Sequence, residues 1–139
     1  METYLQILKD NKLKITLRRK AAISLFKDSG MCMGPYDVYK KLKNELSTLG
    51  LPTVYRILDE LFKAGILIRF LSEDRQLRYM FCSNPHEHHH HHFTCRKCKK
   101  VEEVDFCNFK STSQVIENKL NAKIESHQLQ IEGLCSKCK

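Results

Sequence analysis

Two pairs of cysteines, each separated by two residues, offer the clearest chemistry in this sequence. Cys95 pairs with Cys98, and Cys135 with Cys138. Two such knuckles supply the four thiolates of a tetrahedral structural zinc, with zinc–sulfur bonds of about 2.3 Å. A redox dithiol is the alternative, but the thioredoxin-like βαβ pattern that it needs is absent. The spacing therefore predicts one structural Zn²⁺ that pins the last strand of the chain.

A run of five histidines, His88–His92, stands just before the first knuckle. Because the four thiolates already complete a structural site, these imidazoles indicate a second use of metal. The run is internal, unlike an expression tag, although a nonspecific metal-binding loop is an alternative. It leads into a β-prone segment, where successive side chains point to opposite faces. His90 and His92 would then serve one site, and His89 and His91 another.

Cys82 precedes the histidine run, at the end of the first half of the chain. If Cys82 shares a metal with His90 and His92, the ion bridges the two halves and controls the angle between them. Nitrogen and sulfur ligands with one further group suit Zn²⁺, whereas a more oxygen-rich shell suits Fe²⁺ or Mn²⁺.

Length and composition restrict the class of protein. The chain has 139 residues, 42% of them hydrophobic, which suits one or two small domains. No apolar run approaches the length of a membrane span, and the first residues do not resemble a signal peptide. We therefore expect a cytoplasmic protein with no membrane partner. In a reducing compartment, its seven cysteines favour metal ligation over disulfides.

Positive charge is concentrated in the first half. Residues 1–83 contain 15 Lys and Arg against 9 Asp and Glu, and the remainder contains 9 against 7. The surplus of six in the first half suits a polyanion such as DNA. A merely solubilising surface is the alternative.

The first half has the pattern of short helices followed by a hairpin. Apolar residues recur at helical spacing, with Thr16 as a predicted N-cap and Pro35 and Pro52 in predicted first turns. This order is that of a winged helix, in which the helix before the hairpin enters the major groove. The expected helices are 3–12, 16–29, 35–46 and 52–64, and the expected hairpin strands are 66–70 and 77–81.

The helix expected over 52–64 has an exposed face suited to DNA. Thr53, Tyr55 and Arg56 lie on it, and such side chains reach base edges and phosphates. A small helical domain with a charged outer face is the alternative.

The second half has the pattern of a compact α+β module. Asn84-Pro85 favours a boundary after residue 83, which divides the chain into 1–83 and 84–139. The expected strands are 88–95, 101–106 and 128–134, with a helix over 113–120.

A set of short motifs spans nearly the whole chain. They are Leu13-Lys-Ile-Thr-Leu-Arg-Arg19, Pro52-Thr-Val-Tyr-Arg-Ile57, Ala64-Gly-Ile66, Phe93-Thr-Cys-Arg-Lys-Cys98, His127 and Gly133-Leu-Cys-Ser-Lys-Cys138. In this combination, with the histidine run, the chain resembles the ferric-uptake-regulator (Fur) family of metalloregulators. The resemblance implies an α+β fold: an N-terminal winged-helix DNA-binding domain, then a small α+β dimerisation domain with a four-cysteine structural zinc. It further implies a homodimeric repressor that binds an AT-rich double-stranded DNA operator when its regulatory metal is bound.

The resemblance also implies roles at the DNA. Tyr55 and Arg56 match recognition-helix positions of the family, Arg19 matches a backbone contact, and Lys14 matches a minor-groove lysine.

Within the family, the regulatory ligands are most similar to those of the zinc-uptake regulator (Zur) branch. That branch places a cysteine where Cys82 stands and uses it with two alternating histidines, here His90 and His92. Cys107 also resembles a cysteine of some members of that branch. Ile68, which cannot ligate, stands where zinc-sensing members tend to place a ligand. Cys32 stands where iron and peroxide sensors of the family carry a histidine, so the resemblance implies Cys32 as a candidate fourth ligand, with a small buried residue as the alternative.

A further departure affects an additional metal site. The resemblance implies a site with His89, His91 and His127, but Lys110 stands where the family usually has a glutamate. Glu103 or Asp105 are possible substitutes for that glutamate. His86, Glu87 and His88 are further candidate ligands in the lengthened histidine run.

These observations favour a zinc-responsive transcriptional repressor of metal-uptake genes, not an enzyme, with an iron-sensing Fur-type regulator as the alternative. Two other classes fit many histidines: a metal-dependent hydrolase and a metal-buffering protein. The hydrolase would need an HExxH or nucleophile motif, which is absent. The buffering protein would not need Tyr55 and Arg56 on a basic helix.

Overall fold

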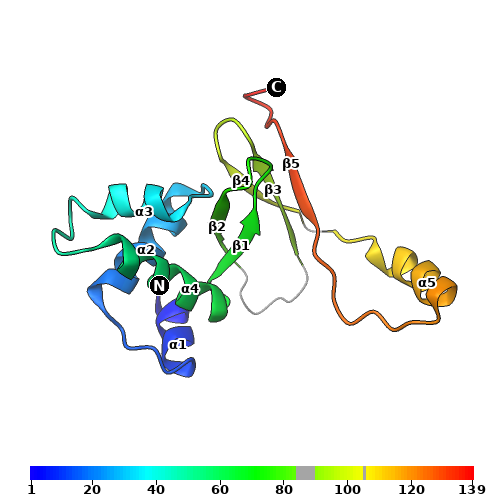
Figure 1. Ribbon diagram of the computed structural model, residues 1–139, viewed down its shortest axis with the longest axis horizontal. Coiled ribbons are helices and arrows are strands. Elements are labelled where there is room, and N and C mark those ends of the chain that lie inside the picture. The colour runs from blue at the N-terminus through cyan, green and yellow to red at the C-terminus, as the bar shows by residue number, and fades with distance from the viewer. Residues whose placement is uncertain (84–89, 105) are drawn as a thin grey trace.

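The computed structural model describes residues 1–83, 90–104 and 106–139. In Figure 1, the helices that precede the hairpin lie at one end, the hairpin and the second sheet lie in the middle, and the last helix lies at the other end. This mixed architecture confirms the predicted α+β class. The elements in the described ranges are α1 (Glu2–Asp10), α2 (Leu17–Ser29), α3 (Pro35–Leu42), α4 (Leu51–Lys63), β1 (Leu67–Leu71), β2 (Leu77–Phe81), β3 (His91–Cys95), β4 (Val101–Val104), α5 (Phe109–Leu120) and β5 (Gln130–Gly133).

Local signals set the ends of the first four helices. The Thr16 hydroxyl accepts a hydrogen bond from the Arg19 backbone N–H at 3.2 Å, which caps α2 as predicted. Gly30 ends α2 with φ 60°, a left-handed conformation that glycine adopts without strain. Pro35 and Pro52 lie in the first turns of α3 and α4, where a missing N–H costs nothing.

The core of the N-terminal part forms around α4. Its buried side chains are Val54, Ile57, Leu58 and Leu61, spaced three or four apart, so that they form one apolar face. The antiparallel pair β1–β2 follows directly as the predicted hairpin. Helices α2 to α4 with this hairpin form the predicted winged helix.

The second sheet has the strand order β4–β3–β5. Strand β3 pairs antiparallel with β4, which sets His92 opposite Glu103. It pairs parallel with β5, which sets Cys95 opposite Gly133. The central strand β3 therefore presents both the histidines and the first cysteine knuckle.

Backbone hydrogen bonds join the two parts of the molecule. The Cys32 N–H donates to the Lys99 carbonyl, and the Val101 N–H donates to the Gly30 carbonyl, both at 3.0 Å. The same segment also contacts the hairpin, because Met33 exchanges two hydrogen bonds of 2.9 Å with Tyr79 of β2. The segment 30–33 thus links the hairpin to the turn that leads into β4. The boundary after residue 83 stays a prediction.

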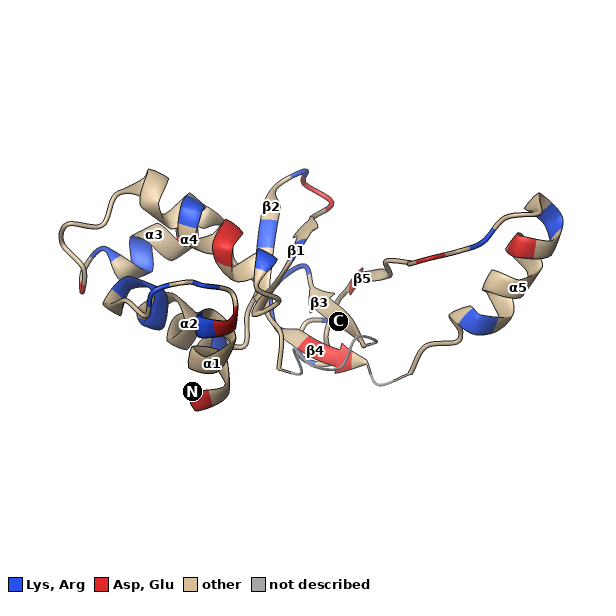
Figure 2. Ribbon diagram, turned by 90° about the horizontal axis from the view of Figure 1, so that it is seen from below, with Lys and Arg blue, Asp and Glu red and all other residues tan. Residues whose placement is uncertain are grey.

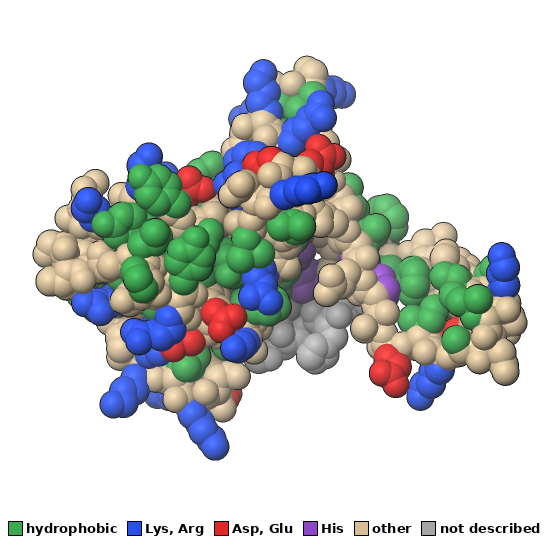
Figure 3. Space-filling view, viewed as in Figure 1, with side chains coloured by type: hydrophobic (Ala, Val, Ile, Leu, Met, Phe, Trp, Pro, Cys, Tyr) green, Lys and Arg blue, Asp and Glu red, His purple; other side chains and the backbone are tan. Residues whose placement is uncertain are grey.

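Helix α5 lies apart from the rest of the fold. It begins at Phe109, one turn earlier than the predicted Ser113, and none of its residues is buried. Figures 1 and 2 show it at the end of two extended segments. Hydrophobic side chains gather on its surface in Figure 3. Across the described ranges, no helix has the length and apolar character needed to cross a membrane.

The buried face of α4 leads to a stability prediction. We expect Leu58→Ala to lower the free energy of unfolding by about 2–5 kcal/mol, because it leaves a cavity in a packed core. Leu58 is 0% exposed, whereas Leu17 on α2 is 70% exposed. Leu17→Ala is the matched control and should cost less than about 0.5 kcal/mol. Urea unfolding followed by far-ultraviolet circular dichroism measures both, and equal losses would contradict this account of the core.

Candidate metal centres and nucleic-acid interface

The four knuckle cysteines come together at one end of the second sheet. The sulfur atoms of Cys95, Cys98, Cys135 and Cys138 all lie within 4.8 Å of one another. The Cys98 and Cys135 sulfurs are 3.7 Å apart. Bonds of about 2.3 Å to a tetrahedral zinc would place two sulfurs about 3.8 Å apart. The donor set and its spacing therefore fit the predicted structural zinc.

Backbone groups prepare this site for a metal. The Cys135 N–H donates to the Cys95 sulfur at 3.4 Å. Hydrogen bonds from the backbone of Cys98 and Cys135 lower the pKa of the Cys95 thiol to about 6, which favours the thiolate that zinc requires. A hydrogen bond with Cys135 raises the pKa of Cys138 to about 12, so this thiol keeps its proton until a metal displaces it.

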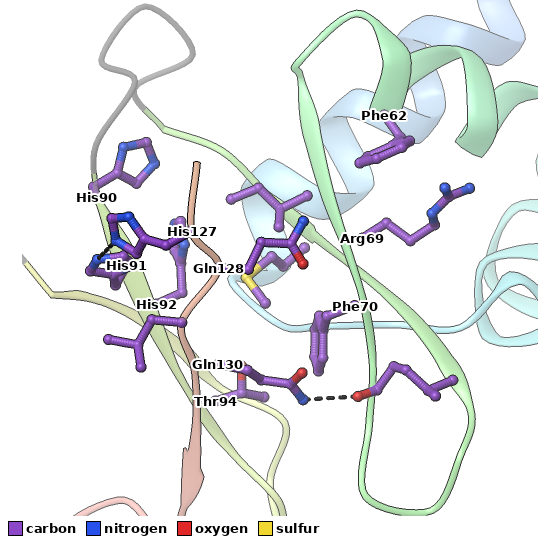
Figure 4. Close-up of a pocket in the computed structure, with 14 residues that line it drawn as sticks. Phe62, Arg69, Phe70, His90, His91, His92, Thr94, His127, Gln128 and Gln130 are labelled. Carbon is purple, nitrogen blue, oxygen red and sulfur yellow. Dashed lines mark hydrogen bonds between the residues drawn. The ribbon is translucent and has the colours of Figure 1, made fainter. Parts of the chain in front are cut away.

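A second group of ligands bridges the two parts of the molecule. His90, His92 and Glu103 have ligand atoms within 4.8 Å of one another. The Cys82 sulfur, which follows the last strand of the hairpin, lies 3.3 Å from Nε2 of His90. Figure 4 shows His92 on β3 and His90 just before that strand begins. The structure thus places His90, His92 and Glu103 in one ligand group, and it sets Cys82 beside His90.

His92 has the surroundings of a metal ligand. Its side chain is 7% exposed, and its Nε2 is buried without a hydrogen-bond partner among the described residues. Burial, and then the charges of His90 and His91, lower its pKa to about 4. The ring is therefore neutral at pH 7, as a ligand must be, and a bound metal would satisfy the buried nitrogen.

Cys32, the candidate fourth ligand, does not lie in the group with His90 and His92. It belongs to none of the ligand groups found among the described residues. It is buried beside a cavity of about 190 Å³ that Thr94 and Arg96 also line. Burial raises the pKa of its thiol. The structure places Glu103, and not Cys32, beside His90 and His92.

A third group forms on the opposite face of β3. His91, Cys107 and His127 have ligand atoms within 4.8 Å of one another. Of the predicted additional site, the structure therefore brings together His91 and His127, with Cys107 beside them. His86, Glu87, His88, His89 and Asp105 lie outside the described residues.

For two of these candidate ligands, Glu103 and Cys107, the sequence did not predict the group in which each one lies. Glu103 was named with Asp105 as a possible substitute for the missing glutamate of the additional site, but it lies opposite His92 in the β3–β4 register. The Glu102-Glu103 pair on a strand was the available signal, because only one of two neighbouring residues faces a given side. Cys107 was noted only as a resemblance, because no motif ties it to His91 or His127.

The candidate DNA-binding residues lie on or near α4. Tyr55 is 50% exposed, and Arg56 and Lys14 are also exposed, while Thr53 is half-buried. Figure 2 shows Lys and Arg along α2 and α3 of the same part. The side chains of Tyr55, Arg56 and Lys14 are therefore accessible from solvent.

Arg19 is held in a different way. Its guanidinium bonds to one carboxylate oxygen of Glu60 on α4, at 2.8 and 3.0 Å, and donates to the Lys14 carbonyl at 2.7 Å. The side chain is 15% exposed. Arg19 therefore ties the segment that carries Lys14 to α4.

Comparison with known proteins agrees with this geometry. Residues 10–132 match the model of the "Ferric uptake regulator family". A "Ferric uptake regulation protein" of Staphylococcus epidermidis is 31% identical over 135 residues, covering 96% of this chain and 93% of that protein.

Solved structures agree as well. The ferric uptake regulator (Fur) of Vibrio cholerae superposes with a TM-score of 0.67 at 30% identity, covering 94% of this chain and 98% of that one. A zinc uptake regulator complexed with zinc and DNA has a TM-score of 0.79 at 20% identity, covering 98% and 90%. This last likeness concerns the fold alone.

The buried imidazole of His92 leads to a pH prediction for the protein freed of weakly held metal. Its pKa of about 4 lies below the ordinary 6.5, so the folded state favours the neutral ring. The stability that this provides should be present above pH 6.5 and be lost as the pH falls toward 4. His92→Phe should flatten that part of the stability curve. An NMR midpoint for His92 near 6.5 would contradict the expectation.

Proposed function

We propose that this chain, which belongs to the ferric uptake regulator family of metal-responsive transcription regulators, is a zinc-dependent, homodimeric repressor of metal-uptake genes. The protein is a DNA-binding regulator and not an enzyme, which removes the hydrolase class. The proposal concerns the identity of the regulatory metal and its ligands, binding to an AT-rich operator, assembly as a homodimer, and a cytoplasmic location.

The observation that carries the proposal is the pair Cys82 and His90. Cys82 belongs to the part that holds α4, and His90 leads into the central strand of the second sheet. Ligands from both parts converge within 3.3 Å of each other. A metal held there would favour one relative placement of the hairpin and the second sheet, which is what a two-state regulator requires.

The donor set supports zinc. We propose Cys82, His90, His92 and Glu103 as the regulatory ligands, which is one sulfur, two nitrogens and one carboxylate oxygen. Bound Zn²⁺ would supply positive charge and four-coordinate geometry without redox chemistry. A thiolate favours Zn²⁺ over Fe²⁺, although the carboxylate keeps iron as the second candidate.

The chain's own residues hold the ligands in register. Pairing of β3 with β4 fixes Glu103 opposite His92. The Cys82 N–H donates to the Ile66 carbonyl at 3.0 Å, which anchors the thiol to the start of the hairpin. Cys32 is not part of the proposed set, because the structure places it beside Thr94 and Arg96.

The DNA contacts are proposed for the outer face of α4. Tyr55 and Arg56 would meet base edges, with Thr53 at the phosphates and Lys14 in the minor groove of an AT-rich operator. Arg19 would act mainly through Lys14 and α4, because its guanidinium is occupied by Glu60. Two copies of α4 in a homodimer would read two half-sites.

The apolar surface around α5 supports the homodimer. Phe106 is 76% exposed, Val115 67%, Leu120 65% and Leu129 51%. An exposed apolar surface of this kind marks a protein–protein contact.

The regulatory site predicts a metal-dependent DNA affinity. Operator binding, measured by fluorescence anisotropy at buffered free Zn²⁺, should be zinc-dependent in the parent protein. Cys82→Ser and Glu103→Gln should each weaken the zinc response by at least about tenfold. The controls are Cys32→Ser and Glu102→Gln, which should leave it unchanged. A full zinc response in Cys82→Ser would remove Cys82 from the site, and a response to Fe²⁺ alone would replace zinc by iron.

The interface predicts different effects for two basic residues. Arg56→Ala should weaken operator binding by about 1–3 kcal/mol and relax sequence preference, because Arg56 is proposed to read a base. Lys119→Ala, on α5, is the matched control and should change neither quantity. Equal losses in the two variants would indicate a nonspecific charge effect.

A further inference from the structure

The N-terminal helix α1 reaches the end of the hairpin through one side chain, Tyr4. Tyr4 is 8% exposed, and with Ile7 and Leu8 it forms the buried face by which α1 packs against the core. Tyr4 lies outside residues 10–132, which match the family model, so that match carries no expectation about this side chain. Its role has to follow from its own contacts.

Tyr4 contacts the residues on both sides of Cys82. Its hydroxyl donates to the Ser83 carbonyl at 3.3 Å. Its ring packs against the Phe81 ring, with centroids 5.0 Å apart and planes at 55°. The Cys82 N–H is held by the Ile66 carbonyl at 3.0 Å. The backbone that carries the thiol is thus fixed at Cys82 itself and, through Tyr4, on either side of it.

We propose that Tyr4 is a positioning residue for the Cys82 thiolate, and that it holds the end of the hairpin where Cys82 can share a metal with His90. This role rests on the proposed function, in which Cys82 is a ligand of the regulatory metal. Tyr4 does not ligate the metal, and it acts through the backbone of residues 81–83.

The sulfur of Cys82 depends on its backbone for its position, because only one side-chain torsion separates it from Cα. It lies 3.3 Å from Nε2 of His90, and a tetrahedral zinc would hold a sulfur and a nitrogen about 3.6 Å apart. Zinc–ligand bonds tolerate deviations of only about 0.2 Å, so a backbone shift of about 1 Å would take the thiolate out of coordination. A contact that fixes this backbone therefore contributes to metal affinity.

The Tyr4 phenol has the surroundings that this role needs. Burial, and then the charges of Cys82 and Glu103, raise the pKa of Tyr4. The phenol therefore keeps its proton at neutral pH and can donate to a carbonyl. Both charges come from members of the proposed ligand set, so Tyr4 lies close to that set as well as to the hairpin.

Removal of one hydroxyl tests the effect on zinc. Tyr4→Phe keeps the ring against Phe81 and loses the hydrogen bond to Ser83. In protein that retains its structural zinc, it should weaken regulatory Zn²⁺ binding by about tenfold, as loss of an outer-shell partner does. Competition with a chromogenic chelator measures this affinity, and the Zn²⁺ that Cys82→Ser loses identifies the regulatory ion. Tyr39→Phe, which removes a hydroxyl from a ring packed against the same core, is the matched control and should change nothing.

Alkylation of Cys82 provides a measurement that needs no regulatory metal. Cys82 is 5% exposed, so iodoacetamide reaches its sulfur only when the end of the hairpin opens. Tyr4→Phe should speed this alkylation by about twofold to tenfold, as loss of one hydrogen bond predicts, measured by peptide mass spectrometry. Tyr4→Leu, which also loses the ring contact, should speed it further. Cys32, which is 3% exposed, is the internal control and should react at the parent's rate.

Three outcomes would overturn the positioning role. Two of them are a parent-like zinc affinity and a parent-like rate of Cys82 alkylation in Tyr4→Phe. The third is equal acceleration at Cys32 and Cys82, because that result would show a general loss of stability and no local effect.

Operator binding separates this role from the proposed function. If the parent's DNA affinity ignores zinc while Tyr4→Phe weakens Zn²⁺ binding and exposes Cys82, the positioning role stands and the zinc-dependent regulator is rejected. If the parent responds to zinc and Tyr4→Phe behaves identically in every measurement, the regulator stands and the positioning role is rejected.

Discussion

The two-residue period of strand β3 is the constraint on which the candidate metal chemistry depends. His91 and His92 point to opposite faces because successive side chains in a strand alternate, and Cys95 ends the same strand. One short strand therefore contributes to all three ligand groups. A shift of register by one residue would exchange the faces of both histidines and move Glu103 away from His92. The pairing of β3 with β4 and β5 thus holds the chemistry in place.

The four-cysteine cluster influences more than the end of the chain. Its first knuckle turns through Lys99, which has φ 66°, and returns to pair Cys95 with Lys100. The same turn carries the Lys99 carbonyl that accepts the Cys32 N–H, so the knuckle forms the joint with the segment between α2 and α3. Ordering of the four cysteines would therefore order the base on which the winged helix rests. This arrangement places a rigid joint beside the ligands proposed to change the relation of the two parts.

The sequence predicts features that depend on neighbouring residues well, and it predicts contacts that depend on the tertiary fold less well. Thr16, Gly30 and Pro35 mark helix ends because caps and first turns depend on neighbours in sequence. The four cysteines were predictable because their spacing is a property of the metal. The places of Glu103 and Cys107 were not, because they depend on which strand pairs with β3 and on how the chain returns from α5. The early start of α5 was also missed, although Asn108 at its N-cap is a residue type that favours this position.

Proton exchange gives a reason why a metal would link the two parts. An ordinary cysteine thiol keeps its proton near neutral pH, and the buried Nε2 of His92 has no hydrogen-bond partner among the described residues. In the proposed ligand set of Cys82, His90, His92 and Glu103, a divalent ion would replace the thiol proton and would also satisfy the imidazole nitrogen. Under the proposed function, this exchange would tie Cys82, and with it the hairpin beside α4, to the strand that carries His92.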